Sequence, residues 1–365
     1  FRCDASRDIG SGHVYRCMAL ADELQKRGWD IAFAATPESA NIVPALSQKF
    51  SLHGQDYAEE CNLLVVDHYG LDAAYERPAR TWARRIVVID DLADRHHDCD
   101  VLIDSTFGRN SSDYKSLVPV HCKLLCGANY AMLRPQFAAL RAQSLARRAT
   151  LSSPPRVLIS LGSTNVGNVT GKVLAALESY SAPLILDVVM GSGAAHLDDI
   201  KTGTLHIDTP DMAALMVQTD IAIGAGGTTS WERCCLGLPT ILIELADNQS
   251  LIASSLHDAG AVLNIGLLND LTAQKIHAAL DDILNNAAKR EAMIKTASAI
   301  CDGRGTERIL PLLYPPRKTK TGQQILSLQR MEASDEKILL DWQSHPDTRK
   351  FARTPTPPAP DEHAA

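Results

Sequence analysis

Short apolar segments alternate with segments of helical periodicity along most of this 365-residue chain. Continuous apolar runs such as Leu64-Val65-Val66 suit strands that are buried on both faces of a sheet. Alternation of such strands with helices is typical of parallel βα units, so the pattern predicts an α/β protein. Strands are predicted at 31–35, 63–67, 86–90, 101–104, 123–126, 157–161, 184–189, 205–208, 221–224, 240–244 and 261–265, and helices at 13–27, 72–84 and 133–147.

A polar, proline-bearing stretch at 147–155 interrupts this alternation and predicts a domain boundary. We expect Rossmann-like domains at 1–146 and 156–313, with a ligand cleft between them at the carboxyl ends of the strands. The chain opens at Phe1 near the end of a predicted strand, so we expect that strand to begin earlier. Pro315-Pro316 mark a second boundary, and the segment beyond it is too short for a core of its own.

Composition excludes several classes of partner. The net charge is −7 without a dense Lys/Arg block, which argues against nucleic acid and leaves an anionic ligand dependent on local donors. No apolar run approaches the ~20 residues that span a bilayer, which argues against a membrane partner. The nine cysteines are irregularly spaced, which favours reduced thiols in the cytoplasm. Cys122 and Cys126 lack a second Cys/His pair at zinc-site spacing, so we expect no metal.

A glycine-bearing loop lies close to the N-terminus, where the sequence reads Gly10-Ser11-Gly12-His13. The two glycines allow a tight bend and a close approach to a ligand. Apolar residues between 14 and 24 are spaced for a helix that starts here. Free N–H groups at a helix start favour anions, so His13 would lie beside a phosphate or a developing negative charge. The alternative is a helix-capping loop with an incidental surface histidine.

A second strand, glycine loop and helix are predicted at 220–233. Gly226 and Gly227 allow close backbone approach, and the hydroxyls of Thr228 and Thr229 follow, a combination that suits a diphosphate. Glu232 lies about one turn into the helix, where its carboxylate could accept both hydroxyls of a ribose. The alternative is a tight turn with an exposed glutamate.

Other polar residues follow predicted strands and so could reach the cleft. Asn248 and Gln249 suit sugar or phosphate oxygens, although ordinary N-capping by Asp247 or Asn248 would explain them equally well. Asp67 and the pair Asp90-Asp91 end strands, but the sequence assigns none of them a role.

Two further groups are interpreted as outside the site. The run Asp98-Cys99-Asp100 is similar to the metal-binding D-x-D of some glycosyltransferases, but it precedes a strand instead of ending one. We therefore interpret it as structural. His96 and His97 are expected to be solvated loop residues.

Six spaced blocks in a fixed order carry a family resemblance, which is more specific than any single block. They are Asp4 to Arg16, Val65 to Tyr69, Val88 to Ala93, Gly127 to Phe137, Gly224 to Glu232, and Asp247 to Gln249. Across residues 1–313 the chain resembles the UDP-sugar hydrolases of pseudaminic acid biosynthesis, which act on UDP-2,4-diacetamido-2,4,6-trideoxy-β-L-altropyranose. The run 161–165 departs from the family pattern, which places a second glycine and an aspartate-proline type turn there.

This resemblance implies a two-domain fold like that of the GT-B glycosyltransferases, with UDP in the C-terminal half. It implies hydrolysis at the anomeric carbon with inversion, without metal or cofactor, releasing UDP and the free sugar. His13 maps onto the essential histidine, as general base or as cationic phosphate ligand, and Asn248 onto the catalytic asparagine near the sugar. The predicted substrate-binding residues are Asp4, Gly10, Gly12, Arg16, Tyr69, Gly226, Gly227, Thr228, Thr229, Glu232 and Gln249.

The segment 326–365 carries a different pattern, in the runs 326–335, 339–342 and 349–351. It resembles the opening of a GNAT-type N-acetyltransferase, which implies an acetyltransferase domain fused in a longer protein. The glycine loop that such a domain needs for acetyl-CoA is absent after residue 326, so this chain is not expected to acetylate. The alternative is a disordered tail.

Two other classes of function fit the same residues. A GT-B glycosyltransferase would pass the sugar to an acceptor, and a UDP-sugar 2-epimerase is a variant of that alternative. A nucleotide-sugar sensor or scaffold would bind its ligand without turnover.

Overall fold

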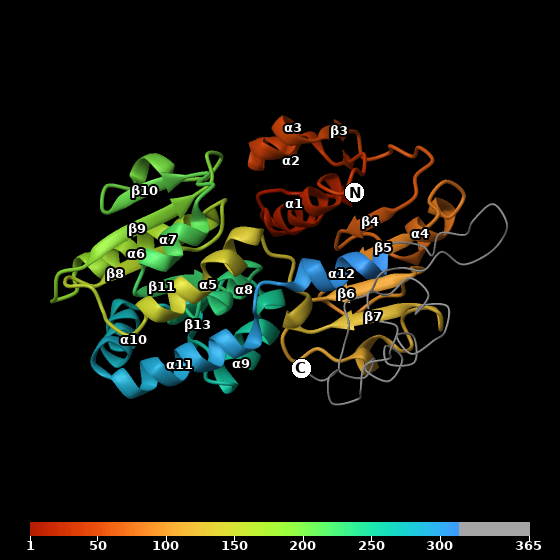
Figure 1. The fold of residues 1–365 in the computed structure, drawn as a ribbon. Coiled ribbons are helices and arrows are strands. Elements are labelled where there is room, and N and C mark those ends of the chain that lie inside the picture. Colours follow the sequence, from red (N-terminus) through yellow and green to blue (C-terminus); the bar gives the residue numbers. More distant parts are fainter. Residues whose placement is uncertain (314–365) are drawn as a thin grey trace, which may run out of the picture. The chain divides into compact units, whose positions relative to one another are not determined.

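Two parallel β-sheets organise residues 1–313, the part of the chain that the computed structural model describes (Figure 1). The first sheet has seven strands in the order β3-β2-β1-β4-β5-β6-β7, and the second has six in the order β10-β9-β8-β11-β12-β13. All pairings are parallel. The strands are β1 (Arg2–Cys3), β2 (Ala32–Ala34), β3 (Ser51–His53), β4 (Leu64–Asp67), β5 (Ile86–Ile89), β6 (Val101–Asp104), β7 (Lys123–Cys126), β8 (Arg156–Ser160), β9 (Ile185–Met190), β10 (Thr204–Ile207), β11 (Ile221–Ala225), β12 (Thr240–Glu244) and β13 (Leu263–Leu267). The predicted α/β class with two Rossmann-like units is confirmed.

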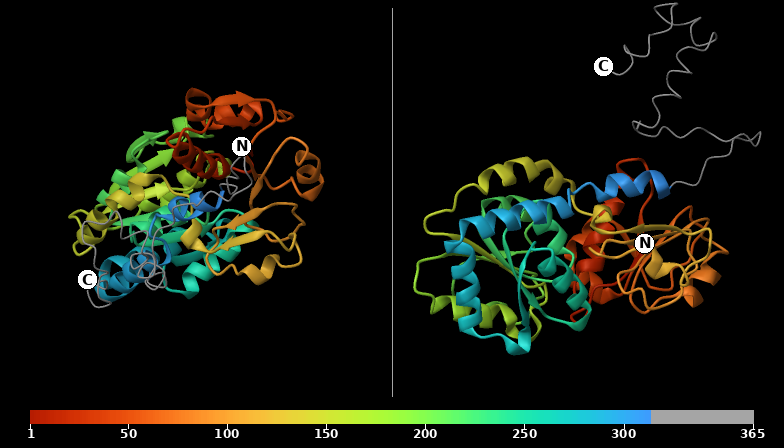
Figure 2. Two further views of the ribbon diagram at one scale, coloured as in Figure 1. Left: turned by 45° about the vertical axis from the view of Figure 1, so that its right-hand side comes forward. Right: turned by 90° about the horizontal axis from the view of Figure 1, so that it is seen from below.

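Helices cover both faces of the second sheet (Figure 2). They bury alternate residues of its strands, such as Leu158 on one face and Val157 and Ile159 on the other. This burial on two sides explains why its strands are continuously apolar. The helices of residues 1–313 are α1 (Gly12–Gln25), α2 (Pro37–Ile42), α3 (Pro44–Lys49), α4 (Ala73–Ala79), α5 (Pro135–Arg147), α6 (Val169–Glu178), α7 (Met212–Gln218), α8 (Thr229–Cys235), α9 (Ser250–Asp258), α10 (Ala273–Asn285), α11 (Ala287–Ile300) and α12 (Gly305–Leu313), with short 3-10 turns between some of them. None of them is long and apolar enough to cross a bilayer.

The segment between β2 and β4 differs from the sequence prediction, which placed no helix or strand there. It forms α2, α3 and the edge strand β3. Pro37 and Pro44 each occupy the first turn of a helix, where proline's missing N–H is not needed. Each helix has only six residues, so no apolar period develops and the prolines suggest turns instead.

Helices α5 and α12 connect the two halves. Helix α5 follows the first sheet in the chain but packs against α7 and α8, and α12 returns to pack against α1 and the 3-10 turn Ala128–Tyr130. The two connections are in close contact, because a β-carbon on Gly305 would overlap the carbonyl of Ala131. Glycine is therefore required where the segments cross.

His97 corrects one prediction, since its side chain is buried instead of solvated. It is 3 % exposed, and its Nδ1 lies 2.7 Å from Oε1 of the buried Glu76 in α4. His96 is exposed, as expected. Just after His97, Asp98 and Asp100 form ion pairs at 3.0 Å and 2.9 Å with Arg80, at the end of α4. The predicted acetyltransferase-like segment, 326–365, lies outside the described residues.

Candidate functional site

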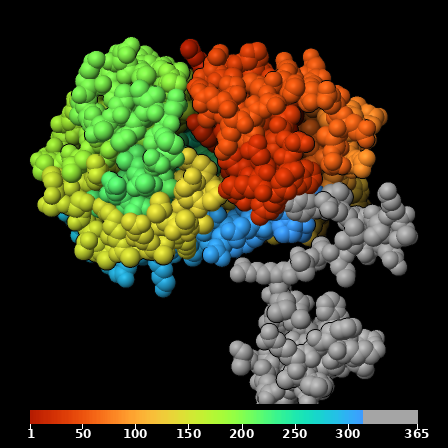
Figure 3. Space-filling view, turned by 45° about the horizontal axis from the view of Figure 1, so that its top comes forward, coloured from red at the N-terminus to blue at the C-terminus, as the bar shows by residue number. Residues whose placement is uncertain are grey.

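A cavity of about 620 Å³ lies between the two halves, at the carboxyl ends of strands from both sheets. Figure 3 shows the cleft that separates the N-terminal segments, in red, from the green segments of the second half. Its wall combines the loop before α1 with the loops that follow β8, β11 and β12. The volume suits a ligand of nucleotide-sugar size.

His13 lies in the first turn of α1 and forms part of the cavity wall, although only 4 % of it is exposed. Its Nδ1 forms a very short hydrogen bond to Oδ1 of Asp67, the last residue of β4. The parallel register pairs Cys3 of β1 with Asp67, which brings the end of β4 beside the start of α1. An ionised carboxylate only accepts, so the proton of a neutral His13 resides on Nδ1 and Nε2 keeps a lone pair.

Arg16, one turn further along α1, fixes the position of the Asp67 carboxylate. Its Nε donates to Oδ2 of Asp67 and its Nη2 to Oδ1, both at 2.6 Å, and its Nη1 donates to Oδ2 of Asp91 at 2.9 Å. Nη2 also lies 3.2 Å from Nδ1 of His13, but its contact with the carboxylate is much shorter. Burial alone would raise the pKa of Asp67, but the charge of Arg16 and the hydrogen bonds from Arg16 and His13 outweigh it and hold that pKa well below its ordinary range.

Tyr69 packs edge-on against His13, with 4.4 Å between the ring centroids. Its hydroxyl oxygen accepts a hydrogen bond of 3.2 Å from Nδ2 of Asn248, which follows β12 in the other half. Burial raises the pKa of Tyr69, so the phenol keeps its proton at neutral pH and can donate into the cavity. The structure therefore brings three predicted site residues together from distant parts of the chain.

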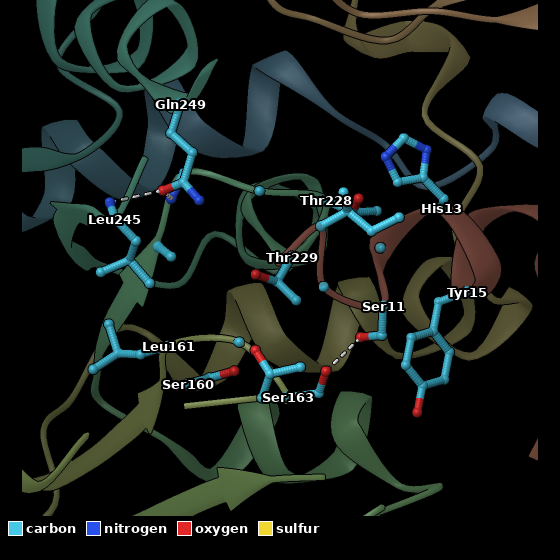
Figure 4. A pocket seen from close by; sticks show the side chains of 18 of the residues that line it. Ser11, His13, Tyr15, Ser160, Leu161, Ser163, Thr228, Thr229, Leu245 and Gln249 are labelled. Carbon is cyan, nitrogen blue, oxygen red and sulfur yellow. Dashed lines mark hydrogen bonds between the residues drawn. The ribbon is translucent and has the colours of Figure 1, made fainter. Parts of the chain in front are cut away.

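The two glycine loops face each other across a short distance (Figure 4). A β-carbon on Gly12 would lie 3.0 Å from Oγ1 of Thr228, so the absence of a side chain permits this approach. Beside it, Oγ of Ser163 donates to Oγ of Ser11 at 2.8 Å. The predicted Gly10, Gly12, Arg16, Gly226, Gly227, Thr228 and Thr229 all line the cavity.

Gln249 accepts a hydrogen bond from the backbone of the second glycine loop. Its Oε1 accepts from the backbone N–H of Gly226 at 3.2 Å and from that of Leu245 at 3.1 Å (Figure 4). The N–H of Gly226 is therefore already used within the protein, although the sequence interpretation placed this glycine on the ligand. Gln249 lines the cavity and retains its NH₂ group as a donor.

Glu232 in α8 lies in the cavity wall and pairs with Arg134 at 3.5 Å. Its side chain is 12 % exposed, and burial raises the pKa of its carboxyl group despite Arg134 and Arg233 nearby. Arg134 was not predicted as a site residue. Its position in a block of family resemblance, just before α5, is the signal that could have identified it.

Asp4 and Asp90, like Asp67, lie outside the cavity wall. Asp4, predicted to contact substrate, accepts from the N–H of Thr36 at 2.8 Å and pairs with Arg2 at 2.9 Å. Asp90 accepts from the hydroxyl of Tyr114 at 2.8 Å. Neither lines the cavity. No group of three or more His, Cys, Asp or Glu side chains within residues 1–313 is placed to hold a metal ion.

Asp91 lines the cavity, although the sequence assigned it no role. It follows β5 and accepts the third hydrogen bond from Arg16. Strand ends of a parallel sheet gather at one edge, so its place directly after a buried strand was the available signal.

The fold is that of the GT-B glycosyltransferases, with two Rossmann-like units around one cavity. The structure aligns with MurG from Acinetobacter baumannii at a TM-score of 0.56 and 15% identity, covering 86% of this chain and 98% of that one. Residues 177–304 match the glycosyltransferase family 28 C-terminal domain.

Two relatives align over most of their length. The UDP-2,4-diacetamido-2,4,6-trideoxy-β-L-altropyranose hydrolase of Campylobacter jejuni is 26% identical over 277 residues, covering 71% of this chain and 96% of that protein. The spore coat polysaccharide biosynthesis protein SpsG of Bacillus subtilis is 26% identical over 335 residues, covering 85% of this chain and 96% of that protein. The chain is thus related both to a UDP-sugar hydrolase and to GT-B glycosyltransferases.

Proposed function

We propose that this protein hydrolyses UDP-2,4-diacetamido-2,4,6-trideoxy-β-L-altropyranose to UDP and the free sugar, with inversion and without a requirement for metal. The observation that carries the proposal is the pairing of His13, which lines the cavity opposite the second glycine loop, with the buried Asp67 behind it. The name of the Campylobacter relative supports the choice of substrate.

In the proposed reaction, water attacks the anomeric carbon from the face opposite UDP. A bond forms between the water oxygen and that carbon, and the bond from the carbon to the phosphate oxygen breaks. UDP leaves with the electron pair, and Nε2 of His13 accepts a proton from the water. Asp67 holds the ring and stabilises the imidazolium, a role that resembles the third member of a catalytic triad.

The second loop supports UDP as the leaving group. Thr228 and Thr229 offer hydroxyls, and Gly227 has no β-carbon to obstruct a phosphate. We assign the ribose to Glu232, which also lines the cavity. Donors aimed at a departing diphosphate stabilise the charge that develops there, and losing one can slow catalysis by ~10²-fold or more.

A time course with the UDP-sugar in H₂¹⁸O, with chelator and without acceptor, tests the proposal by mass spectrometry and NMR. We expect UDP without ¹⁸O and free sugar with ¹⁸O at the anomeric carbon, initially of inverted configuration. Label in UDP would contradict the bond assignment. Release of UDP only in the presence of an acceptor would indicate a transferase. Formation of an epimer that is still linked to UDP would indicate a 2-epimerase. Binding without turnover would indicate a sensor.

Replacement of Glu232 by glutamine should weaken binding of uridine and remove the pH dependence of that binding. Ribose hydroxyls favour the ionised carboxylate, and burial raises the pKa of Glu232, so uridine affinity should fall as the pH is lowered toward 5. Calorimetric titration with uridine between pH 5 and 7.5 measures this without interference from phosphate ionisation. An unchanged pH profile in Glu232→Gln would contradict the ribose assignment.

Replacement of Asn248 by alanine should lower kcat by about 10- to 100-fold while UDP affinity changes little, since an amide near the sugar acts on orientation. Tyr69→Phe is the matched control, because it removes the hydroxyl that Asn248 contacts but keeps the ring on His13. We expect Tyr69→Phe to lower kcat less than Asn248→Ala does. An equal loss of kcat in both variants would mean that Asn248 acts only by holding the hydroxyl of Tyr69.

A further inference from the structure

Arg233 is a buried cation directly behind the second glycine loop. It belongs to α8, is 1 % exposed, and is among the largest fully buried side chains of the described residues. Burial lowers the pKa of its guanidinium to about 10, so the group stays charged at neutral pH. No reaction step proposed above uses this charge.

The hydrogen bonds of Arg233 go to the loop itself. Its Nη2 donates to the carbonyl of Ala225 at 2.7 Å and to Oγ of Ser230 at 3.0 Å, and its Nη1 donates to Oγ1 of Thr229 at 3.0 Å. Its Nε has no hydrogen-bond partner. The guanidinium also lies against Gly224, where a β-carbon would come within 2.5 Å of Nη1.

No carboxylate within residues 1–313 forms an ion pair with Arg233, and the adjacent Glu232 is paired with Arg134. The charge of Glu232 does reach Arg233, but Glu232 shares it with Arg134. A buried charge that forms no ion pair of its own is unfavourable, and its field is weakly screened. The loop residues Ala225 and Thr229, which Arg233 contacts, line the cavity. An anion bound there would supply the ion-pair partner that Arg233 lacks among residues 1–313.

Thr229 lies in the cavity wall (Figure 4) and also contacts the guanidinium of Arg233. Because its oxygen accepts from Nη1, its own O–H proton must point elsewhere and is available to a ligand. A hydroxyl that accepts from a cation is polarised and becomes a stronger donor.

We propose that Arg233 is the buried countercharge for a nucleoside diphosphate in this cavity, acting through the hydroxyl of Thr229. This inference rests on the proposed function only in placing the diphosphate at the second loop. Arg233 is thus a positioning residue that should discriminate charged from uncharged ligands of the same nucleoside.

Calorimetric titration of the full chain with UDP and with uridine tests this inference. In Arg233→Met we expect UDP affinity to fall by about tenfold or more and uridine affinity to stay within about twofold. Arg233→Lys should retain part of the UDP affinity. Thr229→Val should weaken UDP binding to a similar extent. Adding Thr229→Val to Arg233→Met should have little further effect on UDP affinity, because Arg233 is proposed to act through the hydroxyl of Thr229.

Arg148 offers a matched control, because it is also a buried arginine without a carboxylate partner among residues 1–313. It is 6 % exposed, and its guanidinium donates to Oγ of Ser144 and to carbonyls including that of Met216. Neither it nor these partners line the cavity. Arg148→Met should change stability but not the ratio of UDP to uridine affinity.

The inference is overturned if Arg233→Met weakens UDP and uridine alike, leaves UDP affinity unchanged, or behaves like Arg148→Met. If the methionine variant does not fold, Arg233→Lys and Thr229→Val carry the same comparison. Because the readout is binding, a chain that binds UDP through Arg233 but does not hydrolyse the sugar nucleotide would contradict only the proposed function.

Discussion

Replacing His13 by alanine should lower kcat by about 10³-fold or more, because general-base catalysis contributes ~10²- to 10⁴-fold. UDP affinity should stay within about threefold, since Nδ1 of His13 is engaged with Asp67 and not with the second loop. Single-turnover rates and calorimetric titration with UDP separate the two quantities.

The exposed His96 provides the control for His13, and His96→Ala should have normal activity. Loss of UDP affinity together with kcat in His13→Ala would favour the other role, in which a cationic His13 binds the departing phosphate. Turnover near normal in His13→Ala would remove His13 from the mechanism altogether.

Replacing Asp67 by asparagine should lower kcat by about 10²- to 10⁴-fold, because an amide can hold the ring with the proton on the wrong nitrogen. The same change leaves the buried Arg16 with only Asp91 as an anionic partner, so the free energy of unfolding should fall by about 3 kcal/mol. UDP affinity should change little, which distinguishes a positioning defect from general damage to the cavity.

Acid denaturation provides a second readout for Asp67. Its pKa is depressed in the folded state, so the stability that it contributes is present above about pH 4, its ordinary range, and is lost as the pH falls through the folded pKa. Asp67→Asn should therefore show a shallower loss of stability below pH 4 in urea titrations. An unaltered acid profile would contradict the buried ion pair with Arg16.

Most of the fold was predictable because its strands are apolar on both faces and its helices are regularly spaced. The buried residues of α1 include Val14, Met18, Ala21 and Leu24, as the helical period required. The six-residue helices α2 and α3 were missed, since two turns provide too few positions for a period to appear.

The two glycine loops of the site could be predicted from the sequence, but the side-chain contacts between distant residues could not. Glycines and hydroxyls are local signals, so both loops could be found from the sequence. The bond from His13 to Asp67 joins residues 54 positions apart and depends on the pairing of β1 with β4. The role of Arg233 depends on which way one side chain of a short helix points, which no spacing reveals.

Helix α12 is the last described element of the chain, yet it covers a surface formed by residues near the beginning. Its Ile309, Leu310 and Leu313 are buried, and Nη2 of Arg85 donates to the carbonyl of Leu312 at 2.9 Å. Because a protein leaves the ribosome from its N-terminus, the first sheet emerges long before the helix that completes it. The parts of α1 and of the turn Ala128–Tyr130 that α12 contacts therefore stay uncovered until α12 has been synthesised, so the N-terminal half completes its packing only then.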